Sequence, residues 1–216
     1  SYLELSPFII NEIDDTGIGQ ELLWLRGGFP ESLLADTQGQ SMRWRQDFIL
    51  TYLEREIPRF GGSLGSTTLR RLWTMLAHQQ GALLNSSRLA NNLGLDVRTL
   101  NTYLELMEDL FLIRRLEPWF ENTKKRLVKS PKLYLRDSGL VHALLGIQDL
   151  DTLLAHPVLG ASWEGFVLDQ ILAQLPAEVQ AYFYRSAAGA EIDLVLVFPG
   201  EIKWAVEIKR SLMPKP

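Results

Sequence analysis

The sequence has 216 residues, of which 46% are apolar and 22% charged, a composition typical of a soluble globular protein with one large or two small domains. A net charge of −4 excludes an overall basic field, so a nucleic-acid site would have to depend on local clustering. The chain has no cysteine, which excludes disulfides and thiolate metal sites, and no apolar run approaches the roughly 20 residues of a membrane span. These features favour a cytoplasmic protein with no membrane partner.

Residues 1–62 are predicted to be a helical segment that precedes the first domain boundary. The strongest pattern is at 41–59, where apolar and charged residues recur at helical spacing until Pro58 ends the helix. The glycine-rich run at 60–66 is interpreted as a hinge and sets the boundary. It is not a phosphate-binding loop, because the pattern GxxxxGK(S/T) occurs nowhere in the chain.

Residues 63–136 are predicted to form a winged helix-turn-helix. Apolar periodicity indicates three helices followed by two strands, at 68–80, 86–94, 97–109, 111–116 and 132–135. Gly94 lies in the turn before the third helix, and this spacing is typical of DNA-binding modules. We therefore predict DNA as a partner, and a protein–protein use of the same module remains an alternative.

A basic stretch runs through the second half of this region, where lysines and arginines between 114 and 136 are opposed by only Glu117 and Glu121. In an acidic chain such a concentration is typical of phosphate contacts. The start of the third helix adds exposed polar residues, whereas acids in its last turns argue against entry of that half into a groove. The predicted nucleic-acid-binding residues are Arg98, Thr99, Asn101, Lys124, Lys125, Arg126 and Lys129.

Residues 137–216 are predicted to form a connecting helix and then an α-β-β-β unit. The connecting helix is placed at 137–150, and the unit comprises a helix and three strands, at 158–175, 181–185, 191–198 and 203–209. His142 and His156 are too isolated to form a zinc pair and are interpreted as structural. The fold class is therefore α+β, and both ends of the chain read as sequence cut from a longer protein.

The last two strands bring acids together if the loop between them consists of residues 199–201. Antiparallel pairing then sets Asp193 opposite Glu207, with Glu191 opposite Lys209 on the same face. Two carboxylates about 5 Å apart on neighbouring strands repel unless a divalent cation or an ammonium lies between them. Lys209 is a candidate for the ammonium, and Mg²⁺ suits oxygen ligands of this kind. A two-residue loop would shift the register by one residue and remove the pairing.

Glu164 lies on the apolar stripe of the preceding helix, in line with Leu168, where an acid is costly unless it is paired or bound to a metal. Together with the acids and the lysine of the two strands, it resembles the active-site pattern of the PD-(D/E)xK nuclease superfamily. The resemblance implies that Asp193 and Glu207 bind Mg²⁺. It also implies that Glu164 binds the same ion, either directly or through a water molecule. It further implies that Lys209 positions the water that attacks a phosphodiester. The superfamily's final helix and strand are missing, so this restriction-endonuclease-like core is predicted to be truncated.

Longer phrases of the chain resemble prokaryotic AAA-type ATPases that carry a C-terminal domain of unknown function. The most specific are KRLVKSPKLYLRDSGL at 125–140 and GASWEGFV at 160–167, and the similarity covers nearly the whole chain. The resemblance implies that residues 1–26 end an ATPase domain. It places the P-loop and its ATP upstream of this sequence and makes that upstream domain a partner of the segment.

Two functions are compatible with these patterns. The leading hypothesis is a DNA-directed, regulatory C-terminal segment whose Mg²⁺ site hydrolyses phosphodiesters. The alternative is a non-catalytic module for protein–protein interaction or homo-oligomerisation, in which the acids only brace the fold. Under the alternative we expect Glu164 to form a local hydrogen bond or to pair with Lys209, with no cation bound.

Overall fold

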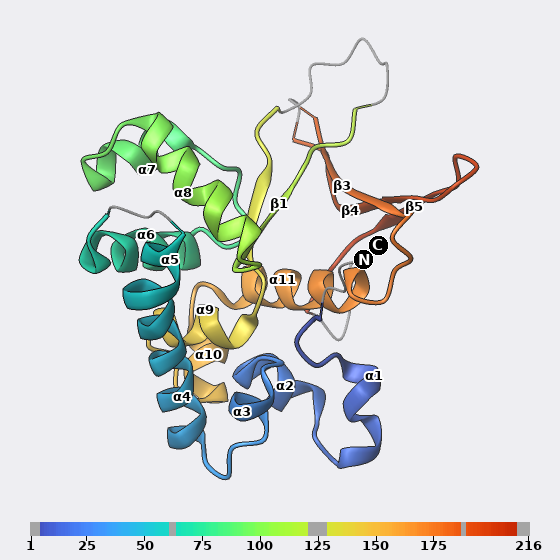
Figure 1. The fold of residues 1–216 in the computed structure, drawn as a ribbon. Coiled ribbons are helices and arrows are strands. Elements are labelled where there is room, and N and C mark those ends of the chain that lie inside the picture. Colours follow the sequence, from blue (N-terminus) through green and yellow to red (C-terminus); the bar gives the residue numbers. More distant parts are fainter. Residues whose placement is uncertain (1–4, 61–63, 121–128, 187–188, 211–216) are drawn as a thin grey trace.

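The computed structural model describes residues 5–60, 64–120, 129–186 and 189–210. Its fold is mixed α+β, with helices and two small antiparallel sheets, which confirms the predicted class (Figure 1). Among the described residues, no helix is long and apolar enough to cross a membrane.

The first group of helices precedes the predicted boundary. Its elements are α1 (Ile10–Ile13), a 3-10 turn (Asp14–Thr16), α2 (Gln20–Arg26), α3 (Pro30–Leu33), α4 (Gln38–Thr51), a π-helical turn (Tyr52–Glu56) and α5 (Ile57–Arg59). Thr37 caps α4: its hydroxyl accepts from the Gln40 amide, and its own amide donates to the Gln40 side chain. The π-helical turn continues α4 into α5, so the predicted helix at 41–59 is confirmed and begins slightly earlier.

The second group lies where a winged helix-turn-helix was predicted. Its elements are α6 (Ser66–His78), α7 (Ser86–Leu93), α8 (Val97–Asp109), β1 (Ile113–Leu116) and β2 (Lys132–Leu135). Asn85 and Asp96 cap α7 and α8, and Gly94 ends α7 in the left-handed conformation that glycine adopts without steric cost. The two strands pair antiparallel, from Ile113 opposite Leu135 to Leu116 opposite Lys132.

The third group contains one helix more than predicted. Its elements are α9 (Ser138–Leu144), α10 (Leu150–Ala155), α11 (Leu159–Leu172), β3 (Gln180–Arg185), β4 (Glu191–Val197) and β5 (Lys203–Val206). The expectation of a single connecting helix at 137–150 is wrong. Gly146 takes a positive φ of 71° after α9, and the Asp149 side chain then caps α10 as a separate helix.

The three-stranded sheet has the order β3-β4-β5 and is antiparallel throughout. In the pairing of β4 with β5, Leu194 lies opposite Val206 and Val197 opposite Lys203. The Phe198 amide donates to the Ile202 carbonyl at 2.8 Å, which leaves 199–201 as the loop. The loop length therefore fixes the predicted register for the pairs from 194 to 197. The predicted pairs of Asp193 with Glu207 and of Glu191 with Lys209 lie beyond the ladder, because β5 ends at Val206 and not at 209.

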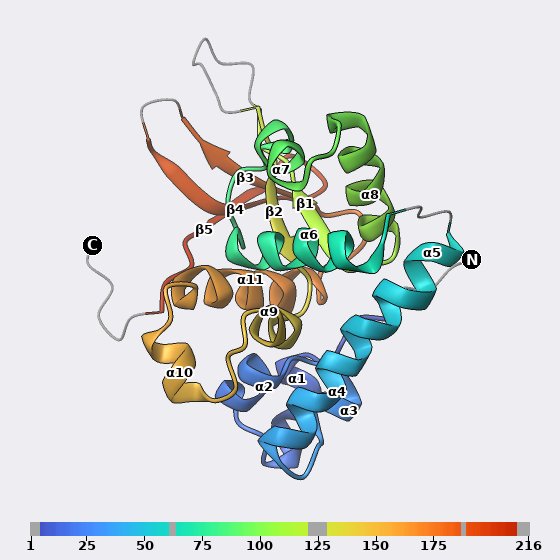
Figure 2. The same cartoon turned by 90° about the vertical axis from the view of Figure 1, so that its left-hand side faces the viewer.

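The β1–β2 pair lies between helices α6–α8 and the three-stranded sheet, and α11 lies between the N-terminal helices and both sheets (Figures 1 and 2). The Trp119 amide donates to the Phe183 carbonyl at 2.7 Å, and the Phe183 amide donates to the Glu117 carbonyl at 3.0 Å. These bonds join the chain that follows β1 to β3. The two sheets are thus held side by side, and this contact positions the site described below.

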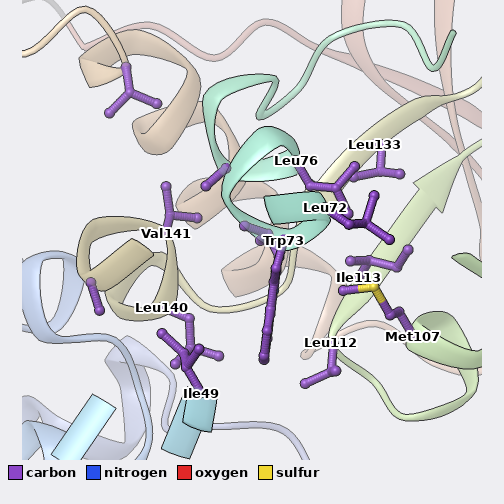
Figure 3. Packing of buried hydrophobic residues seen from close by; sticks show 14 of the residues in the cluster. Ile49, Leu72, Trp73, Leu76, Met107, Leu112, Ile113, Leu133, Leu140 and Val141 are labelled. Carbon is purple, nitrogen blue, oxygen red and sulfur yellow. The ribbon is translucent and has the colours of Figure 1, made fainter. Parts of the chain in front are cut away.

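Two hydrophobic cores support this arrangement. The larger core surrounds Trp73, which is fully buried among Ile49, Leu112 and Leu140 (Figure 3), so it draws on all three predicted regions. Burying each such side chain contributes about 1.5–3 kcal/mol. The smaller core lies between the β1–β2 pair, α11 and the three-stranded sheet, and its buried members are Leu116, Tyr134, Leu168, Phe183, Leu194 and Leu196.

Helices α2 and α9 approach each other at glycines. The buried Asp137 carboxylate accepts from the amides of Gly28 and Leu140, both at 2.9 Å. An added Cβ at Gly139 would lie 2.1 Å from the carbonyl oxygen of Arg26, so the two backbones leave no room for a side chain. The phrases LRGG and DSGL therefore meet in space and form a structural joint.

His142 is fully buried beside this joint, in agreement with a structural interpretation. Its Nδ1 lies 2.9 Å from the Leu25 carbonyl oxygen and its Nε2 lies 2.7 Å from Ser162 Oγ, which also accepts from Trp24 Nε1 at 3.0 Å. Burial lowers the pKa of His142 to about 4, so the ring is neutral at pH 7. The neutral ring then donates from Nδ1 and accepts at Nε2, which satisfies every group in the chain of hydrogen bonds.

Candidate functional site

A buried lysine gathers three carboxylates between the two sheets. Lys132, the first residue of β2, has only 3% of its surface exposed. Its Nζ lies 2.6 Å from Glu191 Oε1, 3.0 Å from Glu164 Oε1 and 3.8 Å from Asp193 Oδ1. Glu164 is on α11, and the other two acids are on β4. We call these four side chains the Lys132 cluster.

Strand alternation explains why the lysine points inward. Lys132 and Tyr134 share one face of β2, because successive side chains of a strand point to opposite sides. The Tyr134 hydroxyl donates to the same Glu164 oxygen that Lys132 contacts, and the Lys132 ammonium lies 5.6 Å from the centre of the Phe183 ring. Leu133 and Leu135, on the opposite face, are buried in the larger core. All four residues of β2 are therefore enclosed.

The cluster keeps its lysine charged. Burial alone would lower the pKa of Lys132, but the Glu164 and Glu191 carboxylates outweigh burial, and the pKa is raised. Burial also raises the pKa of Asp193, with further contributions from the negative charges of Glu164 and Glu207. Burial and Glu164 raise the pKa of Tyr134, which stays a neutral hydrogen-bond donor. Arg185 adds a second cation at the edge of the cluster, with a guanidinium nitrogen 3.5 Å from Glu191 Oε2. The three carboxylates therefore face one buried ammonium and one partly exposed guanidinium.

The structure brings together only part of the predicted catalytic set. Glu164 and Asp193 belong to the Lys132 cluster. The β4–β5 ladder ends at Val206, and the amide of Ile208 donates to Asp193 Oδ2 at 2.8 Å. Glu207 and Lys209 pair with each other at 2.9 Å, with 51% and 54% of their side chains exposed. The ammonium among the buried acids is thus that of Lys132 and not that of Lys209.

The sequence did not predict that Lys132 and Glu191 belong to the same cluster. Lys132 was assigned to the basic stretch, and Glu191 was noted only as the residue opposite Lys209. The available signal was the alternation in KLYL at 132–135, where a lysine and a tyrosine share one face of a buried strand. That pattern does not reveal which acids the lysine meets, because they come from distant parts of the chain.

As the residues lie, the cluster does not fit Mg²⁺. Among the described residues, no group of three or more histidine, aspartate or glutamate side chains is placed to hold a metal ion. The Lys132 ammonium fills the centre of the carboxylates, and one Asp193 oxygen is engaged by a backbone amide. The carboxylate oxygens of the cluster are therefore already engaged by donors of the protein itself.

Most of the basic stretch within the described part is paired inside the fold. Arg114 Nε lies 3.5 Å from Asp169 Oδ1, and Arg115 forms a bidentate contact with Glu108. The Arg136 guanidinium lies 5.3 Å from the centre of the Phe111 ring. Lys129 is exposed, whereas the predicted contacts Lys124, Lys125 and Arg126 lie outside the described residues. Within the described residues, the basic stretch therefore offers less free positive charge than its sequence suggests.

The predicted contacts on α8 lie at its start. Arg98 is exposed and Asn101 is half-buried. The Thr99 hydroxyl donates to Asp96 Oδ2 at 2.6 Å, so Thr99 also stabilises the helix N-terminus. Arg88, on the neighbouring α7, is exposed as well. The N-terminal halves of α7 and α8 thus present arginines to solvent.

Residues 19–151 match a family described as Domain of unknown function (DUF8612), and the chain belongs to this family. Residues 159–216 match a second family, Domain of unknown function (DUF4143). Similar proteins include Uncharacterized protein Mb2031c of Mycobacterium bovis and Uncharacterized protein Rv2008c of Mycobacterium tuberculosis. Each is 42% identical over 212 residues, which cover 98% of this chain and 47% of the relative. The chain spans about half the length of these curated relatives, and no solved structure matches it.

Proposed function

We propose that the chain is a DNA-directed, regulatory segment of an AAA-type ATPase. The second matched family is usually found in the C-termini of AAA ATPases, which supports this parentage. The three helices α6–α8 followed by the antiparallel β1–β2 pair support a winged helix-turn-helix. ATP would then act in the upstream domain, and this segment would carry the contact with DNA.

The observation that carries the proposal is the exposed N-terminal half of α8. Recognition helices of helix-turn-helix proteins contact base edges and phosphates with their N-terminal residues. Arg98 is exposed at that end, and Arg88 lies on the adjacent helix. At the acidic end of α8, Glu108 binds Arg115, whereas Glu105 and Asp109 are exposed and would repel phosphates. The charge distribution therefore favours contact through the first turns of α8.

Replacing Arg98 by alanine should weaken binding of the full-length protein to duplex DNA by about tenfold, and should reduce the slope of log affinity against log salt by about one. Fluorescence anisotropy over a salt series measures both quantities. The control is Arg59→Ala, because Arg59 lies on α5 with 69% of its side chain exposed and only a loose contact with Glu56. Binding that ignores salt, or an equal effect of both variants, would favour the protein-interaction alternative.

Mg²⁺-dependent hydrolysis of phosphodiesters is the alternative that the placement of Lys132 argues against. Its support is the raised pKa of Asp193, to which the charge of Glu207 contributes, although the β4–β5 pairing ends one pair short of these two residues. Under this alternative, DNA incubated with full-length protein and Mg²⁺ is cleaved, and Asp193→Ala and Lys209→Ala abolish the cleavage. Intact DNA under every metal and nucleotide condition would reject catalysis.

A further inference from the structure

We propose that the Lys132 ammonium takes the place that a divalent cation would hold in this sheet, so that the native protein needs no metal there. The inference rests on the nuclease-like reading of the sheet and is independent of DNA binding by α8. It assigns Lys132 a role that neither matched family provides.

The geometry matches an ammonium at the centre of the cluster. The Lys132 ammonium donates to Glu191 at 2.6 Å and to Glu164 at 3.0 Å, and Asp193 lies at ion-pair distance, 3.8 Å. The carboxylates have further donors of their own, since Tyr134 donates to Glu164 and the Ile208 amide donates to Asp193. A divalent cation entering the centre would have to expel the lysine from its hydrogen bonds.

The environment holds the lysine in place. Lysine is almost never fully buried unless it is paired, and only 4% of the Lys132 side chain is exposed. The pairing of Leu116 with Lys132 fixes the register of β2, and the flanking residue Leu133 is locked in the larger core. The backbone of Lys132 is therefore fixed, and its ammonium can leave the carboxylates only through a rotamer change of a buried side chain.

The ammonium comes from a strand outside the three-stranded sheet. Lys132 lies on β2, whereas the acids lie on α11 and β4, so the internal cation ties the β1–β2 pair to the sheet. Arg114 on β1 meets Asp169 on α11 in the same interface. A bound metal would satisfy the acids without this tie, whereas the lysine offsets part of their charge and also fixes the two sheets relative to each other.

Lys132→Cys tests the proposal in the full-length protein, because the segment contains no other cysteine. Alkylation of the unfolded variant with 2-bromoethylamine followed by refolding rebuilds an ammonium on a side chain of almost the same length. Other cysteines of the full-length chain are first replaced by serine. Mn²⁺ binding is measured by calorimetry on the parent protein, the variant and the alkylated variant.

We expect no saturable Mn²⁺ binding at the cluster of the parent protein, one Mn²⁺ per chain in Lys132→Cys, and loss of that binding after aminoethylation. Adding Asp193→Asn to the cysteine variant should weaken its Mn²⁺ affinity at least tenfold. Saturable Mn²⁺ binding by the parent that Asp193→Asn removes would overturn the proposal. A folded cysteine variant that gains no Mn²⁺ binding would overturn it equally.

A second measurement tests the proposal without the Lys132→Cys variant, in case that variant does not fold. In the parent protein labelled with ¹⁵N-lysine, the Lys132 ammonium should give a resonance protected from exchange that Mn²⁺ does not broaden. A resonance that Mn²⁺ broadens or displaces would overturn the proposal. DNA binding is measured on the same samples to separate the two proposals. If the Mn²⁺ results contradict the role of Lys132 while DNA binding is intact, only the proposal for Lys132 is rejected.

Discussion

Gly139→Ala is expected to lower the free energy of unfolding by about 3 kcal/mol or more, because overpacking against rigid backbone cannot relax. The added Cβ would lie 2.1 Å from the carbonyl oxygen of Arg26 and 2.7 Å from the amide nitrogen of Gly27. Both are backbone atoms at the end of α2, so α2 and α9 would have to separate. Urea unfolding followed by circular dichroism measures the loss.

The matched control is Gly160→Ala, another glycine within a helix. An added Cβ at Gly160, in α11, would meet nothing within 4 Å. Alanine there should leave stability unchanged or raise it by about 0.5–1 kcal/mol, because glycine costs that much in a helix. Equal unfolding midpoints for the two variants would show that the contact between α2 and α9 does not limit side-chain size.

Lys132→Met is expected to lower the free energy of unfolding by about 3–5 kcal/mol at neutral pH. Removing one partner of a buried ion cluster leaves the others uncompensated, and this loss exceeds the value of the pair itself. Methionine preserves the apolar stem of the side chain, so the change isolates the ammonium. Lys129→Met is the control, because Lys129 is exposed three residues earlier and should change stability little.

The pH dependence of the free energy of unfolding distinguishes the loss of charge from the loss of packing in Lys132→Met. Burial opposes the charged form of Lys132, but Glu164 and Glu191 outweigh it and raise its pKa. The stabilisation is therefore complete below the unfolded pKa of about 10.4 and is lost as the pH rises through the folded value. In Lys132→Met the deficit should shrink as the pH falls and Asp193, whose pKa is raised by burial, becomes protonated. A deficit that stays constant between pH 3 and pH 8 would indicate lost packing and not lost charge.

Local sequence patterns predicted the features that depend on interactions between residues close together in the chain. The loop at 199–201 fixed the register of β4 and β5, and hence the placement of Asp193 beside the end of β5. The apolar stripe of α11 placed Glu164 toward the interior, with the requirement that it be paired. Each inference depended on a few neighbouring residues and on the known side-chain period of a helix or strand, so distant parts of the chain could not change it.

The partner of Glu164 was beyond such reasoning. A lysine within a run of basic residues is usually interpreted as solvated or phosphate-binding, and the alternation in KLYL sets Lys132 on the face of Tyr134 without showing which acids it meets. Those contacts arise only when β2 packs between the larger core and α11, which brings the lysine to acids from two distant elements. The separate helix α10 was missed for a simpler reason, since Gly146 and the Asp149 cap interrupt an apolar run that looks continuous.

The family phrases acquire a structural explanation. LRGG and DSGL meet where Asp137 binds the backbone of Gly28, and an added Cβ at Gly27 would strike that carboxylate. In the phrase GASWEGFV, a Cβ at Gly165 would lie 2.5 Å from the amide nitrogen of the Gln80 side chain. These glycines thus lie where neighbouring side chains leave no room for a Cβ, and the phrase GASWEGFV also supplies Glu164 to the Lys132 cluster.

The most direct test of the ammonium's place in the sheet is an anomalous-scattering map from crystals soaked in Mn²⁺. We expect continuous density for the Lys132 side chain between Glu164, Glu191 and Asp193, with no manganese peak within coordination distance of these acids. A manganese peak bridging Asp193 and Glu207, with Lys132 turned away, would contradict the assignment and restore the metal-dependent alternative.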